Sequence, residues 1–414
     1  MCYTQSRFKA LLSACVLSLI ATTGWSQQPS LRWLGTLGGY WSYASDVSAD
    51  GSVVVGVVRN ASGQQLAFRW TASGGMQDLG DLGGGGSWAY GVSADGTVVV
   101  GWAWNAAGYQ RAFRWTELGG MQSLGTLPSG NWSAAHDVSA DGAVVVGWAE
   151  NAAGQLRAFR WTASGGMQDL GTLGGRESVA YGVSADGSVV VGWAENAAGQ
   201  RRAFRWTASG GMQDLGTLGG TWSEAYSVSA DGSVVVGVAP YYDYDYFGYY
   251  ERAFRWTASG GMQHLGTLDS LVSRAYGVSA DGSVVVGESL YRAFRWTASR
   301  GMENLNTTYA SLLTNGSVLW LARAISPDGR YIVGYGRNAA TGRYEAFLLD
   351  TGPRCTAHNG DVDNNGCVDD ADLLAVLFAF GQTGSTLGRE DANCDGAVDG
   401  ADLLIVLFNF GSGC

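Results

Sequence analysis

Short runs rich in Val, aromatic and small residues, separated by glycine-rich turns, fill most of this chain. In one representative unit, residues 180–184 form such a run, residues 185–187 (Ala-Asp-Gly) make a turn, and residues 188–194 (SVVVGWA) form a second run. Two further runs follow at residues 203–206 (AFRW) and 212–218. Short Val-rich runs, and the alternation of apolar and polar residues at 203–206, predict strands, and the turn residues between the runs predict hairpins. We therefore expect each unit to be a four-stranded antiparallel meander.

The same unit returns at roughly 45- to 50-residue intervals, which is typical of one β-propeller blade. Its marker is Val-Ser-Ala-Asp-Gly, with a degenerate last copy, Ile-Ser-Pro-Asp-Gly. The marker aspartates are Asp50, Asp95, Asp141, Asp186, Asp231, Asp281 and Asp328. The third strand appears seven times and the fourth only six times, but an unmatched fourth strand stands at residues 31–37. These counts predict an all-β seven-bladed propeller over residues 31–352, in which the N-terminal strand closes the last blade at its outer edge.

The place of each strand within a blade follows from this count. The chain leaves one blade at its outer edge and enters the next at its centre, so the first strand of each unit should be innermost. That strand is rich in small residues, as in Gly-Val-Ser-Ala at residues 182–185, which suits crowding near the axis. An open β-solenoid is the alternative, although it does not account for the displaced N-terminal strand.

Composition and charge narrow the classes of function. The chain of 414 residues has 64 Gly and only 5 Pro, and its formal net charge of −11 comes without any cluster of Lys and Arg. A nucleic acid or an acidic membrane surface is therefore not an expected partner. Residues 1–26 combine a basic start with a short apolar stretch, which predicts a secretory signal peptide and a secreted or cell-surface protein without a transmembrane segment. A lipobox-like Leu-Ser-Ala-Cys at residues 12–15 leaves a lipid anchor as the alternative to free secretion.

Four cysteines follow the signal peptide, all of them near the C-terminus. An even number in an exported chain predicts two disulfide bonds. Three pairings are possible, and we favour Cys355 with Cys414 and Cys367 with Cys394.

Three segments of the repeat carry a family likeness. They are Ala-Phe-Arg-Trp at residues 203–206, Gly-Met-Gln-Asp-Leu-Gly-Thr-Leu-Gly-Gly at residues 211–220 and Val-Val-Val-Gly at residues 189–192. On these segments the repeats over residues 31–352 resemble the HAF family of extracellular repeats, although Ala203 stands where that family usually has His. The resemblance implies export and a repeated architecture, and it implies no particular reaction.

Two sets of polar residues recur in the units, and each has a functional and a structural interpretation. A ring of marker aspartates would attract cations, but each aspartate also caps its own turn, which we favour. Arginines between the Phe and Trp of the third strand suit an anionic ligand. Because every blade but the last has one, we favour packing on a tryptophan such as Trp193 or pairing with a carboxylate such as Asp214. These arginines are Arg69, Arg114, Arg160, Arg205, Arg255 and Arg295.

Positions at which the repeats differ are the best candidates for a binding surface. They fall in the connections from fourth to first strand and in the long loop of the fifth unit, which share one end of a propeller. Exposed Trp and Tyr there would offer a glycan or a protein a large contact area at little entropic cost. The alternative is an extended hairpin whose tyrosines pack on each other. The candidate residues are Trp41, Trp88, Trp132, Trp222, Tyr241, Tyr242, Tyr244, Tyr246 and Tyr249.

Catalysis finds little support in the sequence. The three histidines, His136, His264 and His358, occupy unrelated repeat positions, so no histidine triad or metal cluster is expected. No pair of carboxylates is marked out for glycoside cleavage. We therefore expect a non-enzymatic binding protein. The alternative is an accessory or catalytic component of extracellular polysaccharide degradation.

Two twelve-residue segments near the C-terminus, residues 361–372 and 391–402, have the pattern of calcium loops. Asp or Asn at loop positions 1, 3, 5, 9 and 12 supplies hard oxygens, Gly at position 6 makes the turn, and position 7 offers its backbone carbonyl. We expect two calcium ions. The ligand residues would be Asp361, Asp363, Asn365, Cys367, Asp369, Asp372, Asp391, Asn393, Asp395, Ala397, Asp399 and Asp402.

One apolar helix is expected after each loop, at residues 373–380 and 403–410. A duplicated loop–helix unit of this kind at residues 353–414 resembles a type I dockerin, a small α domain. The resemblance implies a cohesin-like or cell-surface partner, selected in part by loop positions 10 and 11, which here lack the hydroxyl pair common in that family. We expect apolar helices that dock on the propeller or on a partner, and a calcium staple without a partner is the weaker alternative. The partner-selecting positions are Asp370, Ala371, Gly400 and Ala401.

Overall fold

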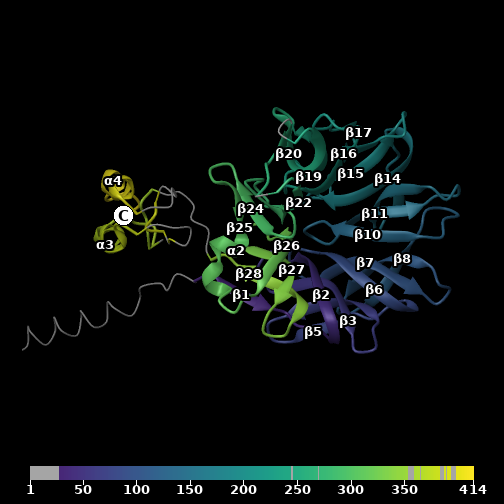
Figure 1. Cartoon of the computed structure of the whole chain (residues 1–414), viewed down its shortest axis with the longest axis horizontal. Coiled ribbons are helices and arrows are strands. Elements are labelled where there is room, and N and C mark those ends of the chain that lie inside the picture. Colours follow the sequence, from purple (N-terminus) through teal and green to yellow (C-terminus); the bar gives the residue numbers. More distant parts are fainter. Residues whose placement is uncertain are drawn as a thin grey trace, which may run out of the picture. The chain divides into compact units, whose positions relative to one another are not determined.

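Four-stranded antiparallel sheets make up the repeat region of the computed structural model, arranged around a common centre (Figure 1). The structure describes residues 28–243, 246–268, 270–352, 359–363, 365–382, 387, 389–392 and 398–414. Ser30–Asp350 forms one compact unit, and the described residues from Thr351 onward belong to another. The signal peptide expected at residues 1–26 lies outside the described residues.

Within each sheet the strands follow one another in chain order, except that the N-terminal strand joins the last sheet. The first strands are β2 (Gly38–Val47), β6 (Gly83–Val92), β10 (Ser133–Val138), β14 (Gly174–Val183), β18 (Glu224–Val228), β22 (Arg274–Val278) and β26 (Val318–Ile325). The second strands are β3 (Val53–Asn60), β7 (Val98–Asn105), β11 (Val144–Glu150), β15 (Val189–Asn196), β19 (Val234–Asp243), β23 (Val284–Glu288) and β27 (Tyr331–Asn338). The third strands are β4 (Gln65–Thr71), β8 (Gln110–Thr116), β12 (Leu156–Thr162), β16 (Arg201–Thr207), β20 (Gly248–Thr257), β24 (Ala293–Thr297) and β28 (Arg343–Asp350). The fourth strands are β5 (Gly75–Asp78), β9 (Gly120–Gly125), β13 (Gly166–Asp169), β17 (Gly211–Asp214), β21 (Gly261–His264) and β25 (Gly301–Asn304), together with β1 (Ser30–Trp33).

The first strands form a closed ring. Each contacts the first strand of the next sheet along the chain, and β26 contacts β2, so the ring returns to its start. Small residues permit this close approach, because a Cβ added to Gly91 would lie only 3.1 Å from the Asp137 backbone in the neighbouring sheet. This is the arrangement of a β-propeller, with the first strands innermost as their small residues predict.

The N-terminal strand completes the last sheet. β1 pairs with β28 in antiparallel register, from Ser30 opposite Asp350 to Trp33 opposite Phe347, which confirms the predicted pairing. The Trp33 and Phe347 rings meet edge-on, with their centroids 6.2 Å apart. A single parallel bridge between Trp41 and Tyr344 also links β2 to β28, so the first and last sheets are continuous.

Each interface between neighbouring sheets has its own apolar cluster. Phe204, for example, packs in one cluster with Val144 and Val146 of the preceding sheet. Full burial of such a side chain contributes roughly 1.5–3 kcal/mol. The equivalent phenylalanines are fully buried, and they are Phe68, Phe113, Phe159, Phe204, Phe254, Phe294 and Phe347.

Buried serines connect the sheets by hydrogen bonds. Ser178 Oγ donates to the Gly171 carbonyl at 2.6 Å and accepts the Ala158 N–H at 2.9 Å, both in the preceding sheet. A second set joins the turns near the axis, where the Ala185 N–H donates to the Ala230 carbonyl of the next sheet at 3.1 Å. The same two patterns recur around the ring, so the sheets are linked through polar groups as well as through apolar contact.

The sheets have two distinct ends. One end carries the loops between second and third strands and the connections from fourth to first strands. We call it the loop end. The opposite end carries the marker aspartates and is called the turn end. Between β25 and β26 the chain forms α2 (Leu305–Thr308) and the 3-10 helix η1 (Ala310–Leu312).

The C-terminal unit contains two helices, α3 (Asp370–Ala379) and α4 (Gly400–Asn409). Each begins three residues earlier than expected, because Asp369 and Asp399 serve as helix caps within capping boxes. Val368 pairs through its backbone with residues 411 and 412 after α4, and Val398 pairs with residues 381 and 382 after α3. Within the described part of the chain, no helix is long and apolar enough to cross a membrane.

Replacing Trp33 by Ala should lower the free energy of unfolding of the repeat region by about 2 kcal/mol, because it removes half-buried contacts that hold β1 to β28. The exposed side chain of Arg32 on the same strand provides the control, and Arg32→Ala should cost less than about 1 kcal/mol. Urea denaturation followed by tryptophan fluorescence measures both. Equal effects of the two variants would contradict a stabilising role for the apolar contact between the two chain ends.

Candidate functional site

The marker aspartates serve their own turns. Asp186 Oδ1 accepts from Ser184 Oγ at 2.6 Å and from the Ser188 N–H at 2.9 Å. Equivalent hydrogen bonds, the largest from Ser229 Oγ, lower the pKa of Asp231 to about 2. The turn-capping interpretation is confirmed, and these hydrogen bonds account for the repeated carboxylates without a bound cation.

Four of the six repeated arginines of the third strands donate to a carbonyl of the next sheet, whereas the Nε atoms of Arg69 and Arg295 are buried without a hydrogen-bond partner among the described residues. Arg160 Nε donates to the Gly187 carbonyl in the marker turn of the next sheet at 3.1 Å, and Arg205 reaches Gly232 in the same way at 3.0 Å. The sequence analysis expected other partners and was wrong on this point. Trp193 lies under Arg201, 4.1 Å from its guanidinium carbon, and Asp214 pairs with Arg202 at 3.7 Å.

A β-bulge in every first strand turns one side chain towards the axis. In β14, for example, the register shifts between Ala180 and Gly182 and leaves Tyr181 unpaired between them. The equivalent residues line a narrow axial cavity of about 100 Å³, and they are Ser45, Tyr90, His136, Tyr181, Tyr226, Tyr276 and Arg323. The sequence analysis missed this set, although each member stands five residues before its marker aspartate.

Most members of this axial set are aromatic and contact each other in ring order. The centroid separations are 5.1 Å for Tyr90–His136, 4.9 Å for His136–Tyr181, 5.4 Å for Tyr181–Tyr226 and 5.4 Å for Tyr226–Tyr276. The guanidinium carbon of Arg323 lies 4.9 Å from the Tyr276 ring centroid. Such aromatic pairs contribute roughly 0.5–1.5 kcal/mol each beyond burial, so the stack makes the axis rigid.

His136 is neutral within this stack. Its Nδ1 lies 2.8 Å from the Ala180 carbonyl, which places the proton on Nδ1 and leaves Nε2 as an acceptor. Burial lowers the pKa of His136 to about 4, so the ring carries no charge at neutral pH.

Two acids, Asp46 and Asp137, each follow a bulge residue on a first strand. Their Oδ2 atoms accept the Val92 and Val183 N–H groups of the next sheet, each at 2.9 Å. Burial raises the pKa of Asp46 to about 6, and burial together with the charge of Asp46 raises the pKa of Asp137 to about 8. At neutral pH the pair therefore holds about one proton.

Towards the loop end the axial cavity widens to about 450 Å³, within the range of small-molecule sites. Its lining residues are Tyr90, His136, Trp148, Leu156, Val179, Tyr181, Trp193, Arg201 and Arg323. Aromatic rings, apolar side chains and two guanidinium groups thus meet in one concave site. The sequence analysis placed none of these residues in a binding site, because they come from several sheets.

Large apolar side chains are exposed at this same loop end. Tyr40 is 75 % exposed and Phe247 is 82 % exposed. Among the residues that the structure describes at the loop end, those in this class are Tyr40, Tyr109, Tyr246, Phe247, Tyr249, Leu290, Tyr291 and Tyr344. Among the described residues of the repeat region, Leu118 is the only exposed large apolar side chain at the turn end.

The tryptophans predicted for the binding surface are half-buried. Trp41 stacks on Tyr43 with centroids 4.7 Å apart, Trp88 stacks on Tyr90 at 5.7 Å, and Trp132 meets Trp104 edge-on at 5.5 Å. Trp222 also lies half-buried, just before β18. These tryptophans therefore pack against neighbouring aromatic side chains and are less exposed than the exposed tyrosines and phenylalanine of the loop end.

The predicted tyrosines lie on the long hairpin of β19 and β20 and divide into two groups. Tyr241 packs against His264 at 4.7 Å, and Tyr242 packs against Tyr249 at 5.1 Å, as the packing alternative expects. Tyr246 and Tyr249 are nevertheless about 60 % exposed, at 61 % and 59 %. Tyr244 lies outside the described residues.

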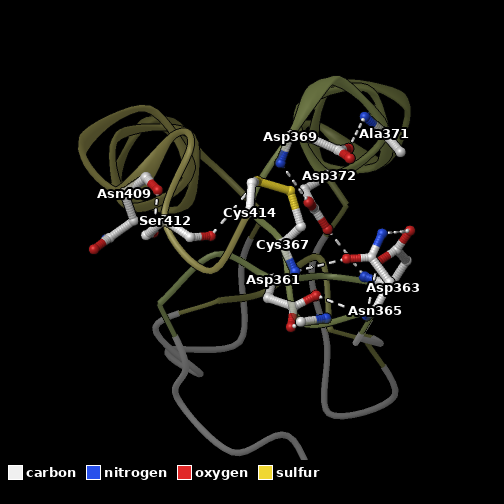
Figure 2. The surroundings of a disulfide bond; sticks show 11 residues. Asp361, Asp363, Asn365, Cys367, Asp369, Ala371, Asp372, Asn409, Ser412 and Cys414 are labelled. Atoms are coloured by element: carbon white, nitrogen blue, oxygen red, sulfur yellow. Dashed lines mark hydrogen bonds between the residues drawn. A yellow bond between two sulfur atoms is a disulfide. The ribbon is translucent and has the colours of Figure 1, made fainter.

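The first expected calcium loop brings three carboxylates together (Figure 2). One oxygen from each of Asp361, Asp363 and Asp372 lies within 4.8 Å of the others. The Asn365 N–H donates to both Asp361 and Asp363, which bends the loop around its acids. This set of hard oxygens on a turning backbone fits calcium, and Asn365, Asp369 and the Cys367 carbonyl would complete the shell.

Two of the loop acids also begin the helix. Asp369 Oδ1 accepts the Ala371 N–H at 2.8 Å, and Asp372 Oδ2 accepts the Asp369 N–H at 2.9 Å. The second loop repeats this arrangement with Asp399 and Asp402, and Asp391 is buried. The other expected ligands of that loop, Asn393, Asp395 and Ala397, lie outside the described residues.

Helices α3 and α4 of the C-terminal unit, with the residue that follows each, expose several large apolar side chains. Phe378 on α3 and Phe408 on α4 are each 83 % exposed. The remaining exposed members are Leu374, Leu377, Phe380, Leu404, Leu407 and Phe410. The residues expected to select a partner, Asp370, Ala371, Gly400 and Ala401, are exposed in the first turns of the helices.

The disulfide bond joins Cys367 to Cys414, with Cα atoms 4.7 Å apart (Figure 2). The favoured pairings of these two cysteines with Cys394 and Cys355 were therefore wrong. The backbone pairing of Val368 with residues 411 and 412 brings the two sulfurs together, and this contact between loop and chain end is not visible in the spacing of the cysteines. Cys355 and Cys394 lie outside the described residues.

No family model matches the sequence, and no curated protein matches it. Similar solved structures include TolB from Acinetobacter baumannii, at 13 % identity and a TM-score of 0.44, where the match covers 74 % of this chain and 65 % of that chain. They also include Kuenenia stuttgartiensis hydrazine synthase, at 12 % identity and a TM-score of 0.42, covering 78 % of this chain and 97 % of that chain. A mutant puromycin hydrolase complexed with PGG matches at 14 % identity and a TM-score of 0.47, covering 76 % of this chain and 54 % of that chain. The chain thus spans less than two thirds of the length of TolB, and these distant likenesses carry no functional argument.

The acid pair at the axis should make stability fall as pH rises. Because the folded-state pKa values of Asp46 and Asp137, about 6 and about 8, exceed the ordinary 3.8, the folded protein binds protons more tightly than the unfolded chain. This contribution is complete below about pH 4 and is lost as pH rises through 6 and 8. We expect the Tm of the repeat region to fall by several degrees between pH 5 and pH 8.5 in differential scanning calorimetry.

Asp137→Ser is the matched variant for this measurement, because Ser227 stands at the equivalent position of another repeat. It should flatten the dependence of Tm on pH even where it lowers the Tm itself. An unchanged slope in this variant would show that other groups cause the dependence.

Peptide mapping without reduction checks the disulfide bond. A proteolytic digest of the oxidised protein should yield a peptide that contains Cys367 linked to one that contains Cys414. Recovery of Cys367 linked to Cys394 would restore the pairing expected from the sequence.

Proposed function

We propose that this chain is an exported, non-enzymatic binding protein. A seven-bladed propeller of HAF-type repeats recognises its ligand at the loop end. A C-terminal dockerin-like module binds two calcium ions and attaches the protein to a cohesin-like or cell-surface partner. The secreted location and the partner rest on the sequence patterns.

The observation that carries the binding role is the uneven distribution of exposed apolar side chains on the repeat region. Tyr, Phe and Leu side chains are exposed at the loop end, beside a concave site, whereas the turn end is closed by polar caps. Exposed aromatic groups around a cavity are typical of recognition surfaces, since rigid rings give contact area at low entropic cost. The residues that recur in every repeat pack the sheets together, so the variable residues of the loop end would determine which ligand binds.

The attachment role is supported by the two helices of the C-terminal unit. Their exposed Phe and Leu residues occur at corresponding positions, as Phe378 and Phe408 illustrate, and such a surface is typical of a docking site. Calcium would neutralise the carboxylates gathered in each loop and hold them together at the start of the helix. Asp361, Asp363 and Asp372 would bind the first ion.

The alternative in polysaccharide degradation gains no specific support from the site. The charge of Asp46 contributes to raising the pKa of Asp137, so the two acids are near each other. Both oxygens of each carboxylate accept backbone N–H groups, however, and the cavity beside them has a volume of only about 100 Å³. Both carboxylates therefore serve as hydrogen-bond acceptors for backbone groups within and between the sheets.

Affinity capture tests the proposal, with the chain after residue 26 as bait in an envelope and secreted extract. A partner should be retained in calcium and released by chelator, because calcium orders the loops from which the helices begin. The double variant Phe378→Ser, Phe408→Ser should lose the partner, and the control Leu118→Ser, at the turn end of the propeller, should keep it.

Calorimetric titration of the same protein with calcium separates the two parts of this proposal. Calcium binding with no retained partner would contradict the attachment role. Failure to bind calcium would contradict the whole assignment of the module.

A further inference from the structure

We propose that the wide axial cavity at the loop end binds a small organic carboxylate, with Arg323 as its charge partner and the hydroxyls of Tyr90 and Tyr181 as hydrogen-bond donors. This inference rests on the proposed binding role of the loop end and deepens it by naming a class of ligand.

Arg323 offers a ligand a positive charge, because its guanidinium has no acid partner among the described residues. Within the described part of the chain it makes no ion pair and no hydrogen bond, and its guanidinium lies half-buried over Tyr276. Arg323 lines both the narrow and the wide cavity, and its charge lowers the pKa values of Asp46, Asp137 and His136. The equivalent positions of the other repeats carry Tyr, His or Ser, so the repeat does not require an arginine here.

Two tyrosines of the cavity wall offer free donors. Trp193 Nε1 donates to the Tyr181 hydroxyl at 3.4 Å, and the Trp102 indole acts on the Tyr90 hydroxyl as a donor that lowers the pKa of Tyr90, against the larger effect of burial. Because indole is only a donor, each phenol oxygen acts as acceptor and its own O–H remains available to a ligand.

The hydroxyl protons of the tyrosines on the other side of the axial ring are not free. Tyr226 donates to Glu224 at 3.0 Å, and Tyr276 donates to Glu288 at 3.1 Å, so their protons are already used. Neither of these tyrosines lines the wide cavity, whereas Tyr90 and Tyr181 both do. The free donors are therefore gathered on the side where there is room for a ligand.

This set of groups favours a carboxylate over a phosphate. Two guanidinium groups line the cavity, but Arg201 already pairs with Glu224 at 3.4 Å, so among the described lining residues Arg323 alone supplies a positive charge without an acid partner. One planar guanidinium matches the two oxygens of a carboxylate, and its single positive charge balances a monoanion rather than a dianion. The rest of the cavity suits an organic body, since Trp148 and Val179 supply apolar surface and neutral His136 supplies an acceptor for a hydroxyl.

Isothermal titration of the mature protein with glucuronate, benzoate and lactate tests the inference, with glucose and sulfate as uncharged and inorganic controls. At least one carboxylate should bind more tightly than both controls and alter the fluorescence of the cavity tryptophans. Arg323→Gln should weaken that binding roughly 30-fold or more, and Tyr181→Phe roughly 10-fold, as expected for hydrogen bonds to a charged group. Arg300→Gln, the same change at the turn end, should leave the affinity unchanged.

Thermal unfolding of each variant establishes that it is folded before its affinity is interpreted. Binding of sulfate as tight as that of the carboxylates, or undiminished binding by folded Arg323→Gln, would overturn the inference. So would a failure of all three carboxylates to bind. If calcium-dependent capture still succeeds in that case, the proposed function stands and only the ligand class is lost.

Discussion

Hydrogen bonds between neighbouring sheets are the constraint on which the propeller depends. A buried serine such as Ser178 satisfies an amide and a carbonyl of the preceding sheet at once, and leaving such buried groups unpaired would cost roughly 1–3 kcal/mol each. The amide ring near the axis has one gap, because its last acceptor residue is Pro327, which has no N–H to continue it. At that seam the bridge between Trp41 and Tyr344 supplies backbone contact, and β1 completes the last sheet.

The repeated framework leaves the axis free to vary. Each bulge aims one residue inward without disturbing the apolar clusters between sheets, so this position tolerates Tyr, His, Ser and Arg. The next residue is Asp in two repeats and Gly, Ser or Ala in the others. Chemical differences are therefore concentrated where the sheets converge, at side chains that the fold itself does not require.

The C-terminal unit uses the same acids for two purposes. Asp369 and Asp372 cap the helix and belong to the expected calcium shell, so binding of an ion would be coupled to order at the start of the helix. The regular spacing of oxygen-bearing residues is the basis of the calcium prediction. The capping role was also readable, from Asp followed three residues later by Asp, but it passed unnoticed beside the stronger calcium pattern.

Periodicity and counting determined a large part of this protein from the sequence alone: the four strands of each unit, the caps of the marker turns, and the pairing of the N-terminal strand with β28. Those features depend on neighbours in the chain or on a surplus strand that needs a partner. Only the tertiary structure decided that Arg205 reaches Gly232, that Cys367 meets Cys414, and that Tyr90, Tyr181 and Arg323 share one cavity. The last three come from repeats far apart in the chain, and closure of the ring brings them within reach of one ligand.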